Sequence, residues 1–360
     1  MVEANVISKK ESYPVSSVLI IGNFLSASGR SRGVCEELSQ RLIQAGWQVI
    51  TASNKANRFL RLLDMVQVAW LNRHQYNIAH VDVYSGGGFL WAEVVCWVLR
   101  RIGKPYILTL RGGNLPNFAK RWPGRVERLL HSAKIVTAPS GYLYEQMQPY
   151  ANKLILLPNP LDIGQYEFHL REQADPTLVW LRALHSIYNP VLAIRVVAKL
   201  VAEFPDIHLM MIGPDRGDGS LQAVEKAIAE LGVVSNVTLV GGVPKVEVPK
   251  WLNKGDIFIN TTNIDNTPVS VTEAMACGLC TISTNVGGIP YLLSDGNDAL
   301  LVPPDDVEAM TAAVHSILVD ANLSKQLSQA GRTTVEAFDW TTILPQWEKL
   351  LGAQSVESTS

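Results

Sequence analysis

Two acidic residues, Asp265 and Glu273, lie eight positions apart in the stretch NTTNIDNTPVSVTEAMACGLCTISTNVGGIP. Thr267 is a candidate helix N-cap, and the proline after it suits the first helical position, so the pattern predicts a helix through VSVTEAMA. The first free amides of this helix, near Val269 and Ser270, suit an anion such as a diphosphate, because amide hydrogens and the helix dipole both stabilise negative charge there. The two carboxylates would flank that anion and accept hydrogen bonds from sugar hydroxyls.

The elements that must position these residues alternate between short β-branched runs and longer helical patterns, which is typical of right-handed βαβ units and a parallel sheet. Strand-like runs begin in the first half at Val18, Gln48, Ile78, Pro105, Lys134 and Leu154, and in the second half at Thr177, His208, Val237, Asp256, Cys280 and Ala299. The predicted class is α/β, with two Rossmann-like, doubly wound parallel-sheet domains. Ligands bind outside the carboxyl ends of such strands, so we expect a cleft between two facing domains.

Length and composition agree with two globular domains. The chain has 360 residues, of which 47% are hydrophobic and 18% charged, and this excludes wholesale disorder, collagen and a disulfide-rich miniprotein. We expect a disordered tail over 1–16, a first domain over 17–165, a second domain over 166–338, a helix over 339–352 that packs back toward the first domain, and a frayed tail over 353–360.

The charge is distributed unevenly between the two halves. Residues 1–165 contain 19 Lys and Arg against 10 Asp and Glu, whereas the remainder contains 12 against 23. The positive excess is concentrated between Arg100 and Lys134, where Glu127 is the single acid. One interpretation is a solvated helix face, and the other is a surface for anionic lipid or a phosphate-bearing acceptor. Nucleic acid is not expected as a partner, because no nucleic-acid-binding motif accompanies these charges.

Cysteine usage and the absence of a signal-peptide pattern before Val18 favour a cytoplasmic protein. No apolar run approaches the roughly 20 residues of a membrane span. Cys277 and Cys280 have the spacing of a redox or metal motif, but they lie in an apolar passage and are interpreted as core residues. No cluster has metal-ligand spacing, so no metal or other cofactor is expected. The absence of a Gly-x-Ser-x-Gly motif removes the common hydrolase interpretation.

Two glycine-containing turns are weaker signals. The turn after the first strand contains Gly29 and Ser31, whose amides would face donor phosphates or the acceptor, although the spacing is not the dinucleotide fingerprint. Gly213 ends a strand of the second domain, where it either lies under a nucleotide or forms a plain turn.

The strings EAMACG and NVGGIP, together with the spacing of the two acids, resemble the retaining nucleotide-sugar glycosyltransferases of family 4, which have the GT-B fold. GKPYILTLRGG, VTAPS, LLPNP and IGPD follow in the expected order, so the resemblance extends from about Val18 to Leu351. It implies that Asp265, which stands where the pattern usually has glutamate, binds hydroxyls of the donor sugar. It also implies that Glu273 binds the nucleotide ribose.

The chain departs from the family pattern at two places. The family usually clamps the donor diphosphate with an Arg and a Lys in a GR-then-KG pattern, whereas this chain has Arg182 and then Asn189 near the lysine position. Asparagine adds a neutral hydrogen bond without charge, so His185 or Arg30 is a candidate to compensate. Arg111 stands where the family commonly has histidine, and it is expected either to bind a charged group of the acceptor or to contact its own domain.

The resemblance implies an enzyme that transfers a hexose-type sugar from a nucleotide diphosphate such as UDP or GDP to a glycan or lipid-linked acceptor, with retention, in surface polysaccharide biosynthesis. Asp265, Arg182 and Arg111 are its expected catalytic residues. The basic first domain would hold the acceptor and draw the enzyme to the inner face of an anionic membrane. Two alternatives stay open: a silent homologue that binds a sugar nucleotide or a partner enzyme, and a nucleotide-sugar epimerase or phosphorylase on the same fold.

Overall fold

The computed structural model describes residues 16–25, 33–55 and 57–356, with side chains up to residue 352. The chain divides into two compact units. The first unit consists of Met1–Thr137, Met147–Ile155 and Leu344–Ser360, and the second of Ala138–Gln146 and Leu156–Ile343.

The division differs from the boundary expected at residue 165, because two short segments before that residue group with the second unit. Tyr291 donates a hydrogen bond from its hydroxyl to Glu145, at 2.9 Å. The amide of Ile163 donates to Asp339 Oδ2 at 3.1 Å. The first of these segments thus belongs to the second unit although the last strand of the first sheet still follows it in sequence.

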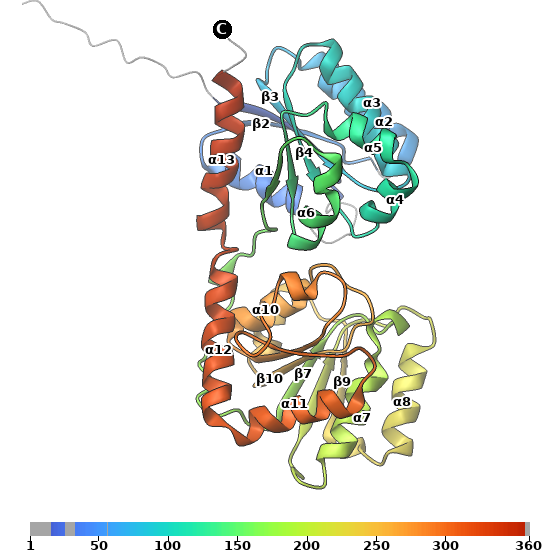
Figure 1. The fold of residues 1–360 in the computed structure, drawn as a ribbon, viewed down its shortest axis with the longest axis vertical. Coiled ribbons are helices and arrows are strands. Elements are labelled where there is room, and N and C mark those ends of the chain that lie inside the picture. Colours follow the sequence, from blue (N-terminus) through green and yellow to red (C-terminus); the bar gives the residue numbers. More distant parts are fainter. Residues whose placement is uncertain (1–15, 26–32, 56, 357–360) are drawn as a thin grey trace, which may run out of the picture. The chain divides into compact units, whose positions relative to one another are not determined.

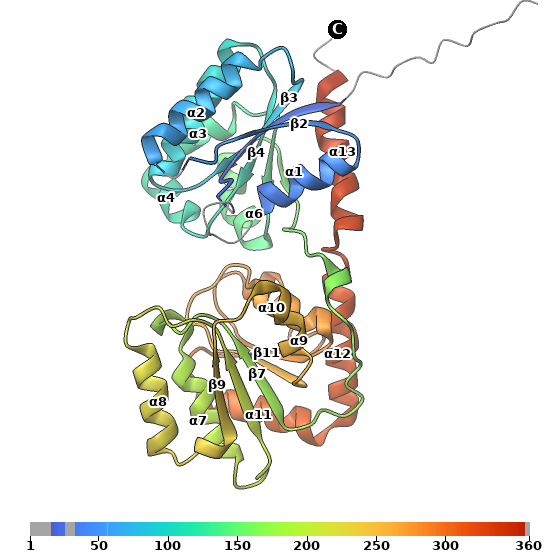
Figure 2. The ribbon, with the colours of Figure 1, turned by 180° about the vertical axis from the view of Figure 1, so that it is seen from behind.

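The first sheet has six parallel strands in the order β2-β1-β3-β4-β5-β6. The strands are β1 (Ser17–Ile21), β2 (Gln48–Ala52), β3 (Ile78–Val83), β4 (Tyr106–Leu110), β5 (Ile135–Ala138) and β6 (Leu154–Leu156). The helices are α1 (Val34–Gln44), α2 (Arg58–Leu71), α3 (Gly87–Arg101), α4 (Leu115–Arg121), α5 (Pro123–Leu130) and α6 (Gly141–Met147). Figures 1 and 2 show α2, α3 and α5 on one face of this sheet, and α1 with α13 (Trp340–Val356) on the other.

The second sheet has six parallel strands in the order β12-β11-β10-β7-β8-β9. They are β7 (Thr177–Leu181), β8 (His208–Ile212), β9 (Val237–Gly241), β10 (Ile257–Asn260), β11 (Cys280–Thr284) and β12 (Leu300–Val302). The helices are α7 (Pro190–Leu200), α8 (Ser220–Glu230), α9 (Val248–Leu252), α10 (Val269–Cys277), α11 (Val307–Val319) and α12 (Ala321–Glu336). All twelve predicted strands are therefore present, which confirms the α/β class.

Alternate residues of the second sheet form two hydrophobic cores. Leu178 and Trp180 of β7 pack in the core that contains α7, α8 and α11. Val179, between them, packs in the core that contains α9 and α10. This alternation follows from the period-two geometry of strands and explains the continuous apolar runs, since a sheet covered on both faces has no polar side.

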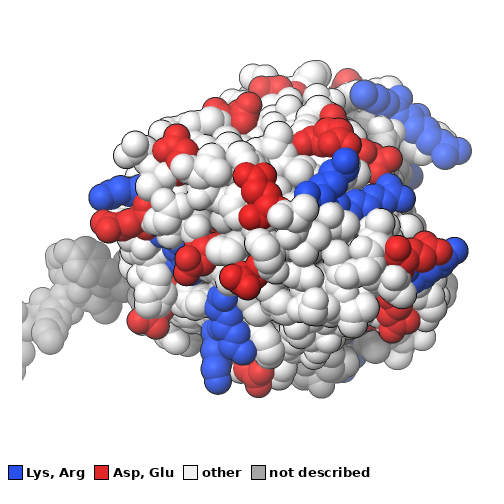
Figure 3. Space-filling view, turned by 90° about the horizontal axis from the view of Figure 1, so that it is seen from below, with Lys and Arg blue, Asp and Glu red and all other residues white. Residues whose placement is uncertain are grey.

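Charge and hydropathy add two observations on the surface. Figure 3 shows acidic and basic side chains interspersed over a face of the second unit, without a basic patch. Within the part of the chain that the structure describes, no helix has the length and apolar character required to cross a membrane.

Candidate functional site

The predicted donor residues gather where the strand order of the second sheet reverses. From β7 the chain proceeds outward to β8 and β9, then returns to β10 on the other side of β7. Such a switch point leaves a crevice at the carboxyl ends of the two neighbouring strands. Arg182 directly follows β7, and the loop that contains Asp265 follows β10, so residues 83 positions apart come together here.

Arg182 pairs with the carboxylate of Asp265, which it contacts through Nη2. Its guanidinium also stacks on the ring of Tyr188, with 4.8 Å between Cζ and the ring centroid. Burial lowers the pKa of Arg182, and the nearby Tyr188 acts in the opposite direction, but a guanidinium stays charged at neutral pH. The buried Nε of Arg182 has no hydrogen-bond partner among the described residues, which leaves a directed donor unused.

The helix predicted after Thr267 is α10, but it begins one residue later than expected. Pro268 is its N-cap, with an extended backbone (ψ 108°), and its carbonyl accepts from the amide of Val271 at 3.1 Å. The expectation that Thr267 caps the helix and Pro268 occupies its first position is therefore wrong. Because ψ of Pro268 is extended, the first carbonyl that accepts a hydrogen bond within the helix is that of Pro268 and not that of Thr267.

The first turn of α10 has free donors among the described residues. Neither the amide of Val269 nor that of Ser270 has a described hydrogen-bond partner, and the buried Ser270 hydroxyl has none either. Buried hydroxyls are normally hydrogen-bonded, so an unpartnered one beside free amides indicates a place for a polar ligand. The amides and the helix dipole favour an anion.

Ser270 and Arg182 line one open cavity of about 270 Å³. Tyr188, Gly213 and Arg216 also contribute to its wall. Arg216 is exposed and forms no ion pair with a described residue. Its amide donates to the carbonyl of Leu184 at 3.2 Å, which holds it beside the segment that follows Arg182. The cavity thus combines two guanidinium groups with the first turn of α10.

Arg216 was not predicted from the sequence, although it follows IGPD at the end of β8 and so lies at the carboxyl edge of the sheet. Gly213, which was predicted, has a φ of 148°, and a Cβ on it would lie 1.7 Å from the carbonyl oxygen of Arg182. Glycine at this position therefore allows the segments after β7 and β8 to approach each other. The expectation that Gly213 lies under a nucleotide stays a prediction.

The Asp265 loop is held by the NVGGIP segment. The carbonyl of Asp265 accepts from the amide of Gly288 at 2.9 Å. A Cβ on Gly287 would lie 2.0 Å from the same carbonyl oxygen, and Gly287 has a φ of 55°. Asp265 Oδ1 accepts from the following amide, that of Asn266, at 2.8 Å. These contacts orient the remaining carboxylate oxygen toward Arg182.

Glu273 lies one turn into α10 and is only 2% exposed. Its Oε1 accepts from the hydroxyl of Tyr166 at 2.7 Å, and it pairs with the ammonium of Lys245. Lys245 is mostly exposed, whereas the carboxylate that it pairs with is buried. Tyr166 and Lys245 were not predicted, because neither belongs to a motif and both lie far from Glu273 in sequence.

Asn189 is in the left-handed region, with φ 45° and ψ 56°, at the entry to α7. Its side-chain amide donates to Asp305 at 2.9 Å. Left-handed backbone is the conformation that glycine adopts without strain, so glycine would also fit at the position of Asn189. The predicted contact between Asn189 and the donor stays a prediction. His185, the suggested compensating residue, accepts from the amide of Ile187 at 3.1 Å.

We expect Asn189→Gly to leave both donor affinity and stability close to those of the wild type. Asn189→Ala should lower the free energy of unfolding by roughly 1–2 kcal/mol, because alanine is strained in left-handed backbone, and should also leave donor affinity unchanged. Chemical denaturation and calorimetry with nucleotide measure the two effects. A loss of donor affinity in the glycine variant would instead assign the Asn189 side chain to the donor site.

In the first unit, Arg111 is buried and donates from Nε to Asp82 Oδ1 at 2.9 Å. These two residues lie at the carboxyl ends of β4 and β3, beside the reversal of strand order in the first sheet. The structure thus gives Arg111 a partner within its own domain, and its contact with an acceptor stays a prediction. Gly29, Arg30 and Ser31 lie outside the described residues.

The predicted basic surface is partly neutralised. Arg125 pairs with Glu93 through Nε and Nη2, and stacks on the rings of Phe89 and Phe118. Arg121 and Arg128 are exposed. Glu93 of α3 thus offsets the charge of Arg125.

Cys277 and Cys280 are free and buried, in agreement with their interpretation as core residues. Burial raises the pKa of Cys277 to about 12 and that of Cys280 to about 11, so neither is a thiolate at neutral pH. Among the residues described, no group of three His, Cys, Asp or Glu side chains could hold a metal ion.

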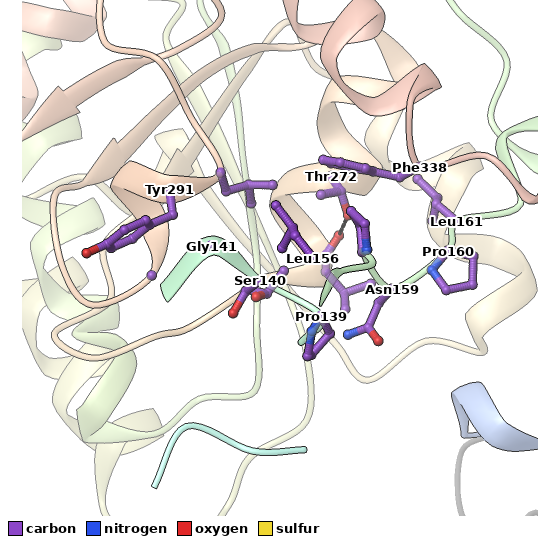
Figure 4. Close-up of a pocket in the computed structure, with 15 residues that line it drawn as sticks. Pro139, Ser140, Gly141, Leu156, Asn159, Pro160, Leu161, Thr272, Tyr291 and Phe338 are labelled. Carbon is purple, nitrogen blue, oxygen red and sulfur yellow. Dashed lines mark hydrogen bonds between the residues drawn. The ribbon is translucent and has the colours of Figure 1, made fainter. Parts of the chain in front are cut away.

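A second cavity of about 110 Å³ also reaches the start of α10 (Figure 4). Thr272 and Phe338 contribute to its wall, together with Pro139 and Leu156. None of the residues that line this cavity carries a charge. It therefore lacks the guanidinium groups of the cavity beside Arg182, although two predicted donor residues, Thr267 and Val269, line it.

Comparison with known proteins relates the second unit to one family by similarity. Residues 165–334 match the family model described as Glycosyl transferases group 1. The D-inositol 3-phosphate glycosyltransferase of Segniliparus rotundus is 22% identical over 271 residues, which cover 68% of this chain and 60% of the relative. The GDP-mannose-dependent alpha-(1-6)-phosphatidylinositol monomannoside mannosyltransferase of Mycolicibacterium smegmatis is 27% identical over 175 residues, 46% of this chain and 45% of the relative. The chain thus spans between about half and three fifths of these relatives' length.

Solved structures share the fold over nearly the whole chain. HepE of Anabaena, crystallised with UDP and glucose, has a TM-score of 0.72 at 16% identity and covers 94% of this chain and 100% of its own. A glycosyltransferase from Rickettsia africae has a TM-score of 0.73 at 16% identity, with 95% and 99% covered. The two-domain α/β fold is that of the GT-B glycosyltransferases. Residues 165–334 of the second unit are therefore similar to the glycosyl transferases group 1 domain.

Proposed function

We propose that the chain is a glycosyltransferase that transfers a hexose-type sugar from a nucleotide-diphosphate sugar to a glycan or lipid-linked acceptor, with retention of anomeric configuration. The observation that carries this proposal is the cavity beside α10, where Arg182, Arg216 and the unpartnered Ser270 hydroxyl surround free helix amides. Two guanidinium groups suit the two phosphates of a nucleoside diphosphate, because planar N–H donors bind phosphate oxygens in pairs.

Each of the two acids pairs with a cation, Asp265 with Arg182 and Glu273 with Lys245, and a bound donor could replace these cations. A bound diphosphate would compete for Arg182 and free the carboxylate of Asp265 for hydroxyls of the donor sugar. Displacement of the exposed Lys245 would free Glu273 for the ribose, while Tyr166 keeps that carboxylate oriented. The ligand-free pairs thus keep the buried Glu273 and the half-buried Asp265 neutralised until the donor brings its own hydrogen-bond donors.

The chemistry then follows from placement and charge. Arg182, Arg216 and the α10 amides would stabilise the negative charge that develops on the leaving diphosphate. These groups supply positive charge of the kind that a divalent cation provides in other transferases, so we expect transfer without added metal. An oxygen of the leaving diphosphate would accept the proton of the acceptor hydroxyl as the new glycosidic bond forms and the sugar–phosphate bond breaks.

The proposal specifies only the chemical class of the acceptor. The relatives from Segniliparus rotundus and Mycolicibacterium smegmatis are named for inositol phosphate and phosphatidylinositol mannoside acceptors. The excess of cations in the first half of this chain suits a phosphate-bearing acceptor of that kind. We place the reaction in the cytoplasm, at the inner face of a membrane.

Turnover with a panel of donors tests the proposal. The donors are UDP-glucose, UDP-N-acetylglucosamine and GDP-mannose. Each is incubated without an acceptor and with inositol phosphate, phosphatidylinositol or a polyprenyl-linked sugar, and the release of UDP or GDP is measured. We expect release with one donor class, and only in the presence of an acceptor. Release or donor epimerisation without acceptor would favour the epimerase or phosphorylase alternative, and nucleotide binding without turnover would favour a silent homologue.

A further inference from the structure

Helix α2 exposes several large apolar side chains to solvent. Phe59 is 82% exposed and Leu63 is 64% exposed, and Trp70 is also exposed further along the same helix. Their spacing of four and seven residues places them on one side of the helix. A helix of a soluble domain normally buries such a stripe against the core, whereas the buried side of α2 is formed by Arg61, Met65 and Ala69. The stripe thus requires an external partner.

The neighbouring helices continue this apolar surface with tryptophans that stack against arginines. Trp97 of α3 is 52% exposed, and the guanidinium of Arg101 lies 5.1 Å from its ring centroid. Arg73 lies 5.4 Å from the ring of Trp70 in the same way. Leu90 of α3 is also exposed. Figures 1 and 2 show α2 and α3 side by side on one face of the first sheet, so these residues share one surface, here called the α2–α3 face.

Two basic grooves lie on this surface, one lined by Arg101, which stacks on Trp97, and the other by Trp97 itself. The first, of about 480 Å³, is lined by Trp70, Arg73, His74, Asn77, Arg101 and Lys104, among others. The second, of about 520 Å³, is lined by Trp97, Arg100, Trp122, Arg125, Arg128 and Glu93. Glu93 is already paired with Arg125, so the net charge of both grooves is positive.

We propose that the α2–α3 face docks on an anionic lipid membrane. Apolar side chains such as Phe59 and Leu63 would enter the acyl boundary, as in helices that lie in the plane of the interface. Tryptophan prefers the headgroup level, and the arginines beside Trp70 and Trp97 would bind lipid phosphates. The positive grooves are complementary to the negative surface potential of the membrane.

Other occupants fit this surface less well. A second copy of the chain docked through the same face would bring the cations around Arg73 and Arg101 against their own equivalents, which is repulsive. A nucleic acid would satisfy the arginines but would leave the apolar stripe of α2 in water. Lipid alone offers phosphate and hydrocarbon in adjacent layers. The inference does not depend on the proposed transferase activity.

Vesicle flotation of the full chain tests the proposal. Vesicles contain phosphatidylcholine alone or with phosphatidylglycerol, and no nucleotide is present. We expect flotation only with the anionic vesicles, weakening as salt rises, together with a blue shift of tryptophan emission as Trp70 and Trp97 leave water. Equal binding to both vesicle types, or to neither, would overturn the proposal.

Matched variants separate the apolar and the charged contributions. Phe59→Ser with Leu63→Ser should abolish the part of vesicle binding that resists salt. Arg73→Gln with Arg101→Gln should weaken binding to anionic vesicles by about fivefold per arginine. Val234→Ser with Val319→Ser, at exposed positions of the second unit, and Lys226→Gln with Lys250→Gln are the controls and should bind as the wild type does.

Three results of this series would contradict the proposal. The first is wild-type flotation by the serine pair at an unchanged melting temperature. The second is an equal loss in the control variants. The third is that the wild type forms a dimer and does not bind vesicles, while the Phe59→Ser, Leu63→Ser variant is a monomer. That result would make the α2–α3 face an interface between copies of the chain. Nucleotide binding is measured separately without lipid, so a failure here leaves the proposed donor site untouched, and the converse also holds.

Discussion

Arg182→Ala is expected to weaken the binding of a nucleoside diphosphate by roughly 10- to 150-fold. Hydrogen bonds to charged groups contribute about 1.5–3 kcal/mol, and Arg182 has an unused, buried Nε at the wall of the cavity. Its removal also leaves the carboxylate of Asp265 without its cation, which adds repulsion toward phosphate. Arg182→Lys keeps the charge but not the paired N–H geometry or the stacking on Tyr188, so it should give an intermediate affinity.

The affinity for a nucleoside diphosphate should also depend on Arg216. Because the chain has Asn189 near the position where the family pattern has lysine, we expect Arg216 to supply the missing charge, and Arg216→Gln should weaken diphosphate binding by about tenfold. The loss should be smaller for a nucleoside monophosphate, which lacks the second phosphate. Arg195, exposed on α7 away from the cavity, gives the control variant Arg195→Gln.

Calorimetry with UDP, UMP, GDP and GMP measures these affinities, and melting temperature reports the fold. Should Arg216→Gln and Arg195→Gln have the same small effect, Arg216 is only a surface residue. Should Arg182→Ala weaken monophosphate and nucleoside equally, Arg182 supports the shape of the cavity and does not bind phosphate.

The local patterns of the sequence were sufficient to predict the architecture. All twelve strands form where β-branched runs occur, because a parallel sheet covered on both faces needs continuous apolar strands. The start of α10 was predicted one residue too early, because a Thr-Pro pair is compatible with either residue as N-cap. The choice depends on ψ of Pro268, which tertiary packing determines.

Partners that are distant in sequence could not be predicted from motifs. Tyr166 reaches Glu273 across 107 positions, and no pattern around either residue indicates the contact. Asn189 was predicted to lie near the family's lysine position, and its left-handed backbone could not be predicted from the sequence. The apolar stripe of α2 is visible in the sequence, but only the structure shows that its apolar residues face solvent and its arginine Arg61 is buried.

Asp265→Asn is expected to lower kcat by about 100- to 1,000-fold while changing the affinity for free nucleoside diphosphate little. The asparagine keeps the shape of the side chain and removes the charge. An interaction made mainly in the transition state is lost from kcat rather than from binding, and a single stabilising group of this kind is typically worth about 2.7–4 kcal/mol. Asp265 meets the structural requirement, since the Gly287–Gly288 turn holds its backbone and one carboxylate oxygen faces Arg182.

Glu273 should behave in the opposite way. Glu273→Gln is expected to raise KM for the sugar nucleotide and Kd for the nucleotide by roughly tenfold or more, with a small change in kcat, because a ribose contact is made equally in the ground and transition states. Tyr166→Phe removes the hydroxyl that orients Glu273, so it should also raise KM and Kd with little change in kcat, but by a smaller factor. Steady-state kinetics with the donor identified by turnover, together with calorimetry, distinguish the two acids.

A structural role for both acids predicts a different pattern. If Glu273 only neutralises Lys245 and Asp265 only orders its loop, then each substitution should lower the melting temperature, and kcat and KM should follow the folded fraction. Lys245→Met is a useful companion, because it leaves Glu273 buried beside Tyr166 without its cation. If Glu273 binds ribose, Lys245→Met should strengthen nucleotide binding, since no ion pair then has to be broken. If Glu273 is a structural ion-pair partner, the same variant should only destabilise the fold. Activity that survives in both Asp265→Asn and Glu273→Gln at an unchanged melting temperature would exclude this account of the donor site.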